Sequence, residues 1–174
     1  MERSKNVRPL ALTLTVAGAL ARLLPHPPNF APVGGMSLYA GARLRGWQAF
    51  ALPLLLMAVT DPLLGGYSVA TPFVYLSFLI SVAIGRRLQA TENPVRIGAA
   101  CFACSAQFFV ISNFGTWLSW YPHTMAGLSQ CYVAAIPFFG RTLAGDLLYT
   151  AVLFGLHAWL SRSLHSAERI PAAA

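Results

Sequence analysis

The stretch 97-IGAACFACSAQFFVISNFGTWLSWYPHTMAGLSQCYVAAIPFFG-140 contains no lysine, arginine, aspartate or glutamate. A transmembrane helix needs about 20 predominantly apolar residues, so this stretch is longer than a single crossing of a bilayer. Its middle, residues 113–124, is polar and rich in turn-forming residues, and we expect it at the outer surface. The stretch therefore predicts an integral membrane protein with one span over residues 94–116 and another apolar segment over residues 127–139.

The segment 127–139 is expected to be a re-entrant piece or an outer helix, separate from the last span. A single helix from 127 to 160 would be about 51 Å long, well beyond a hydrocarbon core of about 30 Å. Pro137 and Gly140 favour a break, after which we place the last span at residues 141–160.

Basic residues are grouped as if on one side of a membrane. Ten of the 12 lysines and arginines fall in four clusters, which are Arg3, Lys5 and Arg8; Arg43 and Arg45; Arg86, Arg87 and Arg96; and Arg162 with Arg169. The positive-inside rule assigns this side to the cytoplasm. The spacing predicts an all-α protein with six transmembrane helices and both termini cytoplasmic, with spans at 9–24, 31–44, 47–64, 72–85, 94–116 and 141–160.

The composition agrees with a single membrane domain over residues 1–174. Hydrophobic residues make up 56% of the chain and charged residues only 10%, whereas soluble domains are about 25% charged. A net charge of +7 also suggests nucleic acid, but here the basic residues flank apolar runs and form no stripe on a polar domain. We therefore expect contact with membrane lipid and no binding of nucleic acid.

The second span, residues 31–44, is short and flanked by prolines. A helix of this length covers only about 21 Å. Irregular backbone exposed to lipid is very costly, so the outer end of this span should be covered by protein or border a cavity.

Four ionisable residues map to the outer halves of the spans, and their charges sum to zero: Arg22, Asp61, Arg141 and Asp146. A charge within the bilayer costs about 3 kcal/mol even on permissive scales, so these side chains should pair, face the interior or bind a ligand. We expect Arg22 to pair with Asp61 or Asp146, and Arg141 to pair with the other. The set is either a structural ion-pair network or part of a ligand pocket.

Polar and aromatic neighbours on the same face favour a pocket for a polar or zwitterionic molecule of vitamin size. The candidate ligand-binding residues are Arg22, Asn29, Asp61, Asn113, Trp117, His123, Tyr132, Arg141 and Asp146. We expect no enzyme, because no nucleophile elbow, phosphate loop or carboxylate pair with a nearby base occurs.

Three further features have alternative interpretations. Cys101 and Cys104 share a helical face, but zinc needs two more ligands, so small apolar fillers are the favoured interpretation and no metal site is expected. His157 suits a hydrogen-bonded core position better than ligation of haem or pigment, and the cofactor stays unknown. The small residues Thr13, Ala17 and Ala21 either pack inside the bundle or form a docking face for a partner.

A set of motifs between residues 20 and 157 resembles an uncharacterised family of small bacterial membrane proteins. The motifs are Arg22-x-x-Pro25-x-Pro27-Pro-Asn-Phe-x-Pro32, Asp61 with Gly65, Asn113-Phe-Gly-x-Trp117, Tyr121-Pro-x-Thr124-x-Gly127-Leu128, Cys131-Tyr132-x-Ala-Ala-x-Pro137-Phe, and Gly145-Asp146-x-x-Tyr149 with Phe154-Gly155. That family is similar to the substrate-binding S components of energy-coupling factor transporters, which are six-helix proteins.

The resemblance implies a multi-pass protein of the bacterial inner membrane that captures a vitamin-like nutrient at its outer face. It also implies a transmembrane energising subunit with ATPases, docked on the face of Thr13, Ala17 and Ala21. A different class stays open: a structural or accessory subunit of a large respiratory or photosynthetic membrane complex, in contact with its other subunits and with pigment or lipid. The polar residues expected at the outer face distinguish the two classes, because a nutrient-binding protein requires them whereas a purely structural subunit does not.

Overall fold

The computed structural model describes residues 7–89 and 91–167, and within them the chain is all-helical. Six α-helices follow one another: α1 (Val7–Ala21), α2 (Val33–Arg43), α3 (Gln48–Thr60), α4 (Thr71–Arg86), α5 (Pro94–Trp120) and α6 (Met125–Ala167). A short 3₁₀ turn, η2 (Asp61–Leu63), extends α3. The basic residues Arg3, Lys5 and Arg169, and the two chain termini, lie outside the described residues.

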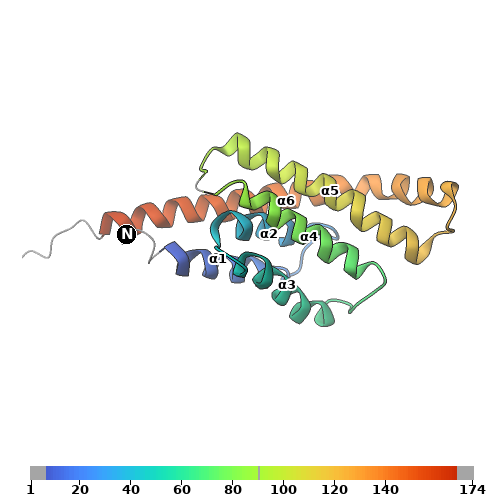
Figure 1. The fold of residues 1–174 in the computed structure, drawn as a ribbon, viewed down its shortest axis with the longest axis horizontal. Helices are drawn as coiled ribbons and strands as arrows, with labels where there is room; N and C mark the ends of the chain where they lie inside the picture. The colour runs from blue at the N-terminus through green and yellow to red at the C-terminus, as the bar shows by residue number, and fades with distance from the viewer. Residues whose placement is uncertain (1–6, 90, 168–174) are drawn as a thin grey trace, which may run out of the picture.

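Helix α2 lies at the centre of the bundle and contacts each of the other five α-helices (Figure 1). All residues from Val33 to Ala42 are buried. Glycine permits this close packing, since a Cβ atom on Gly41 would overlap the backbone of Val82, and one on Gly85 would overlap the carbonyl of Leu38. Helix α2, predicted from its short length to have its outer end covered by protein or bordering a cavity, is thus enclosed by the other helices.

Helices α5 and α6 form a long antiparallel hairpin that reaches beyond α1–α4 at one end (Figure 1). These two helices, over Pro94–Trp120 and Met125–Leu164, are long and apolar enough to cross a membrane. The helices α1, α3 and α4 are apolar but shorter.

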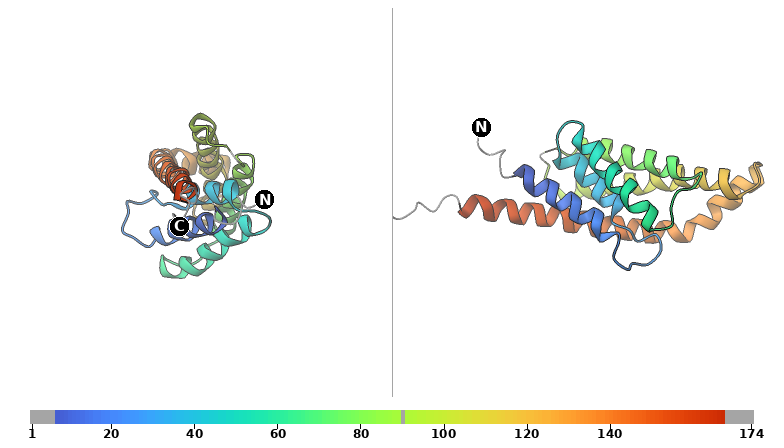
Figure 2. Two further views of the ribbon diagram at one scale, coloured as in Figure 1. Left: turned by 90° about the vertical axis from the view of Figure 1, so that its left-hand side faces the viewer. Right: turned by 90° about the horizontal axis from the view of Figure 1, so that it is seen from below.

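Two predicted boundaries in the hairpin are wrong. Helix α5 continues to Trp120, so most of the expected outer loop 113–124 is helical, and α6 is one helix of 43 residues with Pro137 inside it. Figure 2 shows that α6 bends in its N-terminal third instead of breaking. A bend removes one backbone hydrogen bond at proline, whereas a break would leave several backbone groups without partners.

Charged side chains connect four helix ends at the opposite end of the bundle. Arg43 donates to the carbonyl oxygens of Leu88 and Thr91, at 3.4 and 2.7 Å, and Arg162 lies 3.1 Å from Glu92. The C-terminal ends of α2, α4 and α6 and the start of α5 therefore meet here. This is the end that carries the described basic clusters.

Candidate ligand-binding site

An ion pair joins the segment after α1 to the end of α3. Arg22 Nη2 lies 2.8 Å from Asp61 Oδ1, and Arg22 Nη1 donates to Thr60 Oγ1 at 2.7 Å. The Tyr75 hydroxyl of α4 donates to Asp61 Oδ2 at 2.6 Å. The side chains of the pair are only 13% and 12% exposed, so the two charges are largely removed from solvent. Of the two partners predicted for Arg22, Asp61 and Asp146, the structure shows Asp61.

Asp146 is the second buried acid, at 4% exposure, and its partners are neutral. It accepts a hydrogen bond from Ser105 Oγ at 2.6 Å and another from the backbone N–H of Gly35. Gly35 lies in the first turn of α2, where Pro32 occupies the N-cap and supplies no side-chain cap. Asp146 of α6 therefore caps α2 from outside the helix, and the positive end of the helix dipole stabilises the carboxylate.

Two glycines allow this contact. A Cβ atom on Gly34 would overlap the Asp146 carboxylate, and one on Gly35 would lie 2.8 Å from the backbone nitrogen of Thr150. The Gly34-Gly35 pair, which sequence reasoning would assign to a simple turn, is in fact the surface on which α6 packs against the start of α2.

The expected pairing of Arg141 with Asp146 is wrong. Arg141 is exposed, and no ion pair joins it to Asp146 in the described part of the chain. The two residues are five positions apart on one continuous helix, which places them about 140° apart around its axis. Arg141 therefore points away from the side of α6 that faces the bundle.

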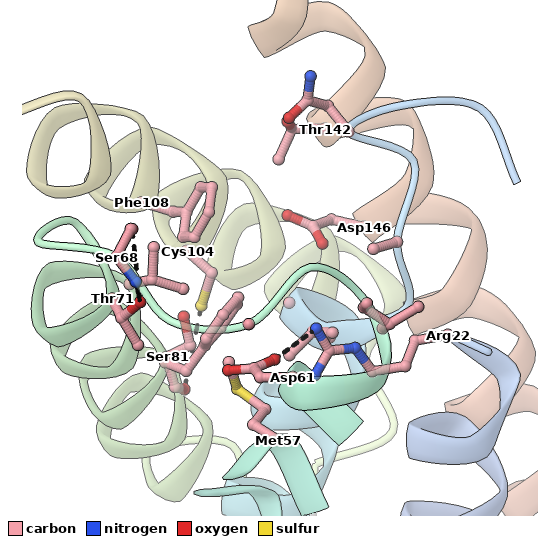
Figure 3. Close-up of a pocket in the computed structure, with 18 residues that line it drawn as sticks. Arg22, Met57, Asp61, Ser68, Thr71, Ser81, Cys104, Phe108, Thr142 and Asp146 are labelled. Carbon is pink, nitrogen blue, oxygen red and sulfur yellow. Dashed lines mark hydrogen bonds and ion pairs between the residues drawn. The ribbon is translucent and has the colours of Figure 1, made fainter. Parts of the chain in front are cut away.

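A cavity of about 300 Å³, called here the first chamber, lies between the ion pair and Asp146. Figure 3 shows the Arg22–Asp61 pair on one side of it and Asp146 with Thr142 on the α6 side. Residues of the loop before α2 and of the loop between η2 and α4 contribute to its wall, among them Asn29, Leu64, Gly66 and Ser68. The inner wall is formed by Ser81, Cys104 and Phe108.

A second cavity of about 240 Å³, called here the second chamber, adjoins the first. The two chambers share Asn29, Val74, Phe108 and Thr142. The second chamber extends between α5 and α6, and its other residues are Phe109, Ser112, Asn113, Thr116, Ala135, Phe138 and Phe139. The two chambers lie side by side with four lining residues in common, and together they are called here the cleft.

Asn29 occupies the junction of the chambers in a left-handed backbone conformation, with φ of 63°. Asparagine tolerates this conformation better than most residues because its short polar side chain bonds locally. The strained turn carries the exposed Asn29 side chain to the edge of both chambers.

Five of the nine predicted site residues line the cleft, and four do not. Arg22, Asn29, Asp61 and Asp146 line the first chamber, and Asn113 lines the second. Trp117 and His123 instead pack against each other at the tip of the hairpin, with ring centroids 5.4 Å apart, and Tyr132 donates to the carbonyl of Val110 at 2.6 Å. Arg141 is the fourth residue outside the cleft.

The sequence analysis did not identify several residues that lie in or beside the cleft. Ser105 holds the Asp146 carboxylate, and Thr142 and Phe108 lie where the chambers meet. Ser105 left a usable signal, since a hydroxyl in the middle of a charge-free helix is expected to face protein. Cys104, expected to be an apolar filler, is buried and also borders the first chamber.

The structure also decides between the alternative interpretations given above for His157 and for the small residues of α1. His157 is buried, and its Nδ1 lies 2.6 Å from the Tyr39 hydroxyl, which is the hydrogen-bonded core position favoured from the sequence. Thr13 and Ala17 are exposed and Ala21 is half-buried, so the interpretation of this face as internal packing is wrong. The packed face of α1 consists instead of Ala11, Leu14, Thr15, Gly18 and Ala19.

The chain belongs to a family of unknown function, DUF6580, whose model matches residues 3–169. No protein of curated function and no solved structure shows significant similarity to it. Membership of the family is thus shown over nearly the whole chain, and what the protein does must be argued from the cleft.

Proposed function

We propose that the protein is a substrate-binding subunit of the bacterial inner membrane, resembling the S components of energy-coupling factor transporters. In this proposal it captures a small, vitamin-like nutrient at the outer face, and a transmembrane energising subunit with ATPases drives its release. The observation that carries the proposal is the cleft, in which three of the four outer ionisable residues line one chamber.

The lengths of the hairpin helices support a position for the cleft in the outer half of the membrane. Helix α5 has 27 residues and is about 40 Å long, enough to cross a core of about 30 Å. Counted from Pro94, Cys104 lies about 15 Å and Thr116 about 33 Å along the helix. Trp117 and Trp120 then lie at the outer interface, where tryptophan is enriched.

The basic residues at the other end support the same orientation with six spans. Arg43, Arg86 and Arg162 lie on helix ends that meet there, which is the arrangement that the positive-inside rule expects for a cytoplasmic face. Helices α1–α4, with 11 to 16 residues, cover only about 16–24 Å, so their outer ends stop below the tip of the hairpin. In this proposal a ligand reaches the cleft over the outer ends of α1–α4.

Empty space beside the charges favours binding over a purely structural network. A network that only closes the bundle needs no cavity, and packed protein interiors contain few voids larger than a water molecule. The first chamber alone, at about 300 Å³, reaches the lower bound of small-molecule pockets, which is about 300 Å³.

A second candidate, the accessory subunit of a large respiratory or photosynthetic complex, is supported by the free face of α1. Thr13 and Ala17 are exposed there together with Leu20, which is 51% exposed, and Leu24 in the segment after α1 is 65% exposed. Either an energising subunit or the neighbours in a larger complex would cover this face.

Ligand binding by the purified protein tests the proposal. The full chain, extracted in mild detergent, is screened against vitamins, their precursors and metal complexes by thermal shift, and the extract is examined by native mass spectrometry. A concentration-dependent rise in melting temperature is expected for a true ligand. If nothing binds, and the protein is recovered only in fixed stoichiometry with other subunits, the accessory-subunit function replaces the transport function.

A further inference from the structure

The two chambers of the cleft differ in chemistry. All charged residues that line the cleft, Arg22, Asp61 and Asp146, belong to the first chamber. The second chamber is lined by four phenylalanines and by the hydroxyl and amide groups of Ser112, Asn113, Thr116 and Thr142. A ligand that fills the cleft must therefore have one end suited to charge and one end suited to aromatic and neutral polar contacts.

The charges of the first chamber do not cancel. Arg22 is neutralised by Asp61, at 2.8 Å, whereas Asp146 accepts only from a hydroxyl and a backbone N–H. The dipole of α2 offsets about half a charge at most. An excess of negative charge thus remains in a poorly solvated chamber, where electrostatic attraction is several times stronger than in water.

Helices α5 and α6 independently show the order of the two chambers along the axis of the hairpin. On α5 the first chamber takes Cys104 and Phe108, and the second continues from Phe109 to Thr116, nearer the hairpin tip. On α6, which runs the other way, the second chamber takes Ala135 to Thr142 and the first takes Thr142 and Asp146. The charged chamber is therefore the deeper one, and the aromatic chamber lies nearer the tip.

We infer that the ligand of this cleft is an elongated organic cation, bound with its positively charged nitrogen beside Asp146 and a flat, uncharged part in the second chamber. The inference rests on the proposed function and specifies its substrate class. Phe108 and Phe109 offer ring faces or edges to the flat part, and Asn113 and Thr116 offer hydrogen bonds. An anion of the same shape is disfavoured, because its charge would meet Asp146.

The test uses compounds that share a ring and differ in charge. The cations are tryptamine, phenethylamine and 1-methylnicotinamide; the anions are indole-3-propionate, 3-phenylpropionate and nicotinate; the neutral members are indole-3-propanamide, 3-phenylpropanamide and nicotinamide. Binding to the full chain in detergent is measured by thermal shift and by isothermal titration calorimetry. We expect at least one cation to bind, and its anionic and neutral counterparts to bind at least tenfold more weakly.

Two substitutions assign the charge preference to the deep chamber. Asp146→Asn removes the negative charge but keeps one of the two oxygen acceptors and the size of the side chain, and it should weaken binding of the cation at least tenfold. Since Asp146 also caps α2, a second variant leaves it untouched: Thr142→Lys places a positive charge at the half-buried junction of the chambers. Thr142→Lys should abolish cation binding, whereas Thr142→Gln, of similar length and uncharged, should retain it.

The outcomes separate this inference from the proposed function. If the nutrient screen or the matched set yields an anionic or neutral ligand that competes for the cleft and no cation binds, the protein binds substrate but the inference is overturned. The inference is overturned too if a cation binds equally well to wild type and to Thr142→Lys. If no molecule of any charge binds, the proposed function fails, and the cation inference fails with it.

Discussion

Each end of the bundle carries an arginine–carboxylate ion pair. The two pairs have the same chemistry but differ in exposure, in hydrogen-bond partners and in whether they border a cavity. At the hairpin-tip end, Arg22 and Asp61 are 13% and 12% exposed, border a cavity and bond to Thr60 and Tyr75. At the opposite end, Arg162 and Glu92 are 75% and 60% exposed. Exposed pairs contribute little to stability, whereas a buried charge requires its partner. The comparison separates a surface ion pair at one end from a buried ion pair beside a cavity at the other; under the proposed function, the first end faces the cytoplasm and the second holds the ligand.

The strongest test of this comparison is whether the two ends lie on opposite sides of the membrane. Tyr67→Cys and Tyr121→Cys should react with an impermeant maleimide in intact cells, and Gln89→Cys should react only after the membrane is permeabilised. The reason is that Tyr67 and Tyr121 lie in the turns at the hairpin-tip end, whereas Gln89 follows α4 at the basic end. Labelling of Gln89→Cys with protection of Tyr67→Cys would overturn the six-span orientation.

The next largest effect is expected from breaking the buried pair. Arg22→Met leaves Asp61 with Tyr75 as its remaining partner in the described structure, and it should lower the free energy of unfolding by about 3 kcal/mol. Denaturant titration in detergent measures the change. The double variant Arg22→Met with Asp61→Asn should recover part of the loss, since no uncompensated charge remains. Additive effects of the two single changes would show that the residues do not act as a pair.

A smaller effect is expected at the contact between α2 and α6. Gly35→Ala brings a Cβ atom to 2.8 Å from the Thr150 backbone nitrogen, so one helix must shift. Such overpacking costs about 2 kcal/mol. The matched control is Gly98→Ala in α5, where an added Cβ meets nothing within 4 Å. Equal stability of the two variants would contradict the packing described for Asp146 and the start of α2.

The smallest effect is expected at the exposed pair. Arg162→Met should change the free energy of unfolding by less than about 1 kcal/mol, because solvent screens both charges. The same denaturant titration, performed beside that of Arg22→Met, gives the difference between the two ends directly. A loss at Arg162 as large as that at Arg22 would remove the distinction between a structural site and a surface pair.

The sequence was most informative where an unfavourable burial had to be compensated. The sequence predicted that Arg22 pairs with a buried acid, Asp61 or Asp146, because an unpaired charge is costly in an apolar setting, and the structure identifies Asp61 as that partner. The short α2 was likewise predicted to have its outer end covered by protein or bordering a cavity; its residues are buried, and Val33 and Gly34 at its start also line the first chamber. In each case a single large energy term decided the result.

The sequence was least informative where several small free-energy contributions to the local conformation compete. Residues 113–120 contain turn-forming residues, yet they continue α5, and Pro137 bends α6 without ending it. In both places the hydrogen bonds of a continuous helix outweigh the local preferences. Trp117 and His123 were therefore assigned to the pocket when they belong to the hairpin tip, and Thr142 was missed because its position depends on how α6 continues.

The cap that Asp146 provides for α2 also constrains how the molecule is made. Helix α2 has 11 residues and is about 16 Å long, too short to be inserted as an independent span. Its N-terminal turn obtains a carboxylate from α6, which follows α2 in the chain after three other α-helices. A nascent chain that ends after α5 has an uncapped α2 and lacks the α6 side of both chambers, so neither chamber is complete before α6 has been synthesised.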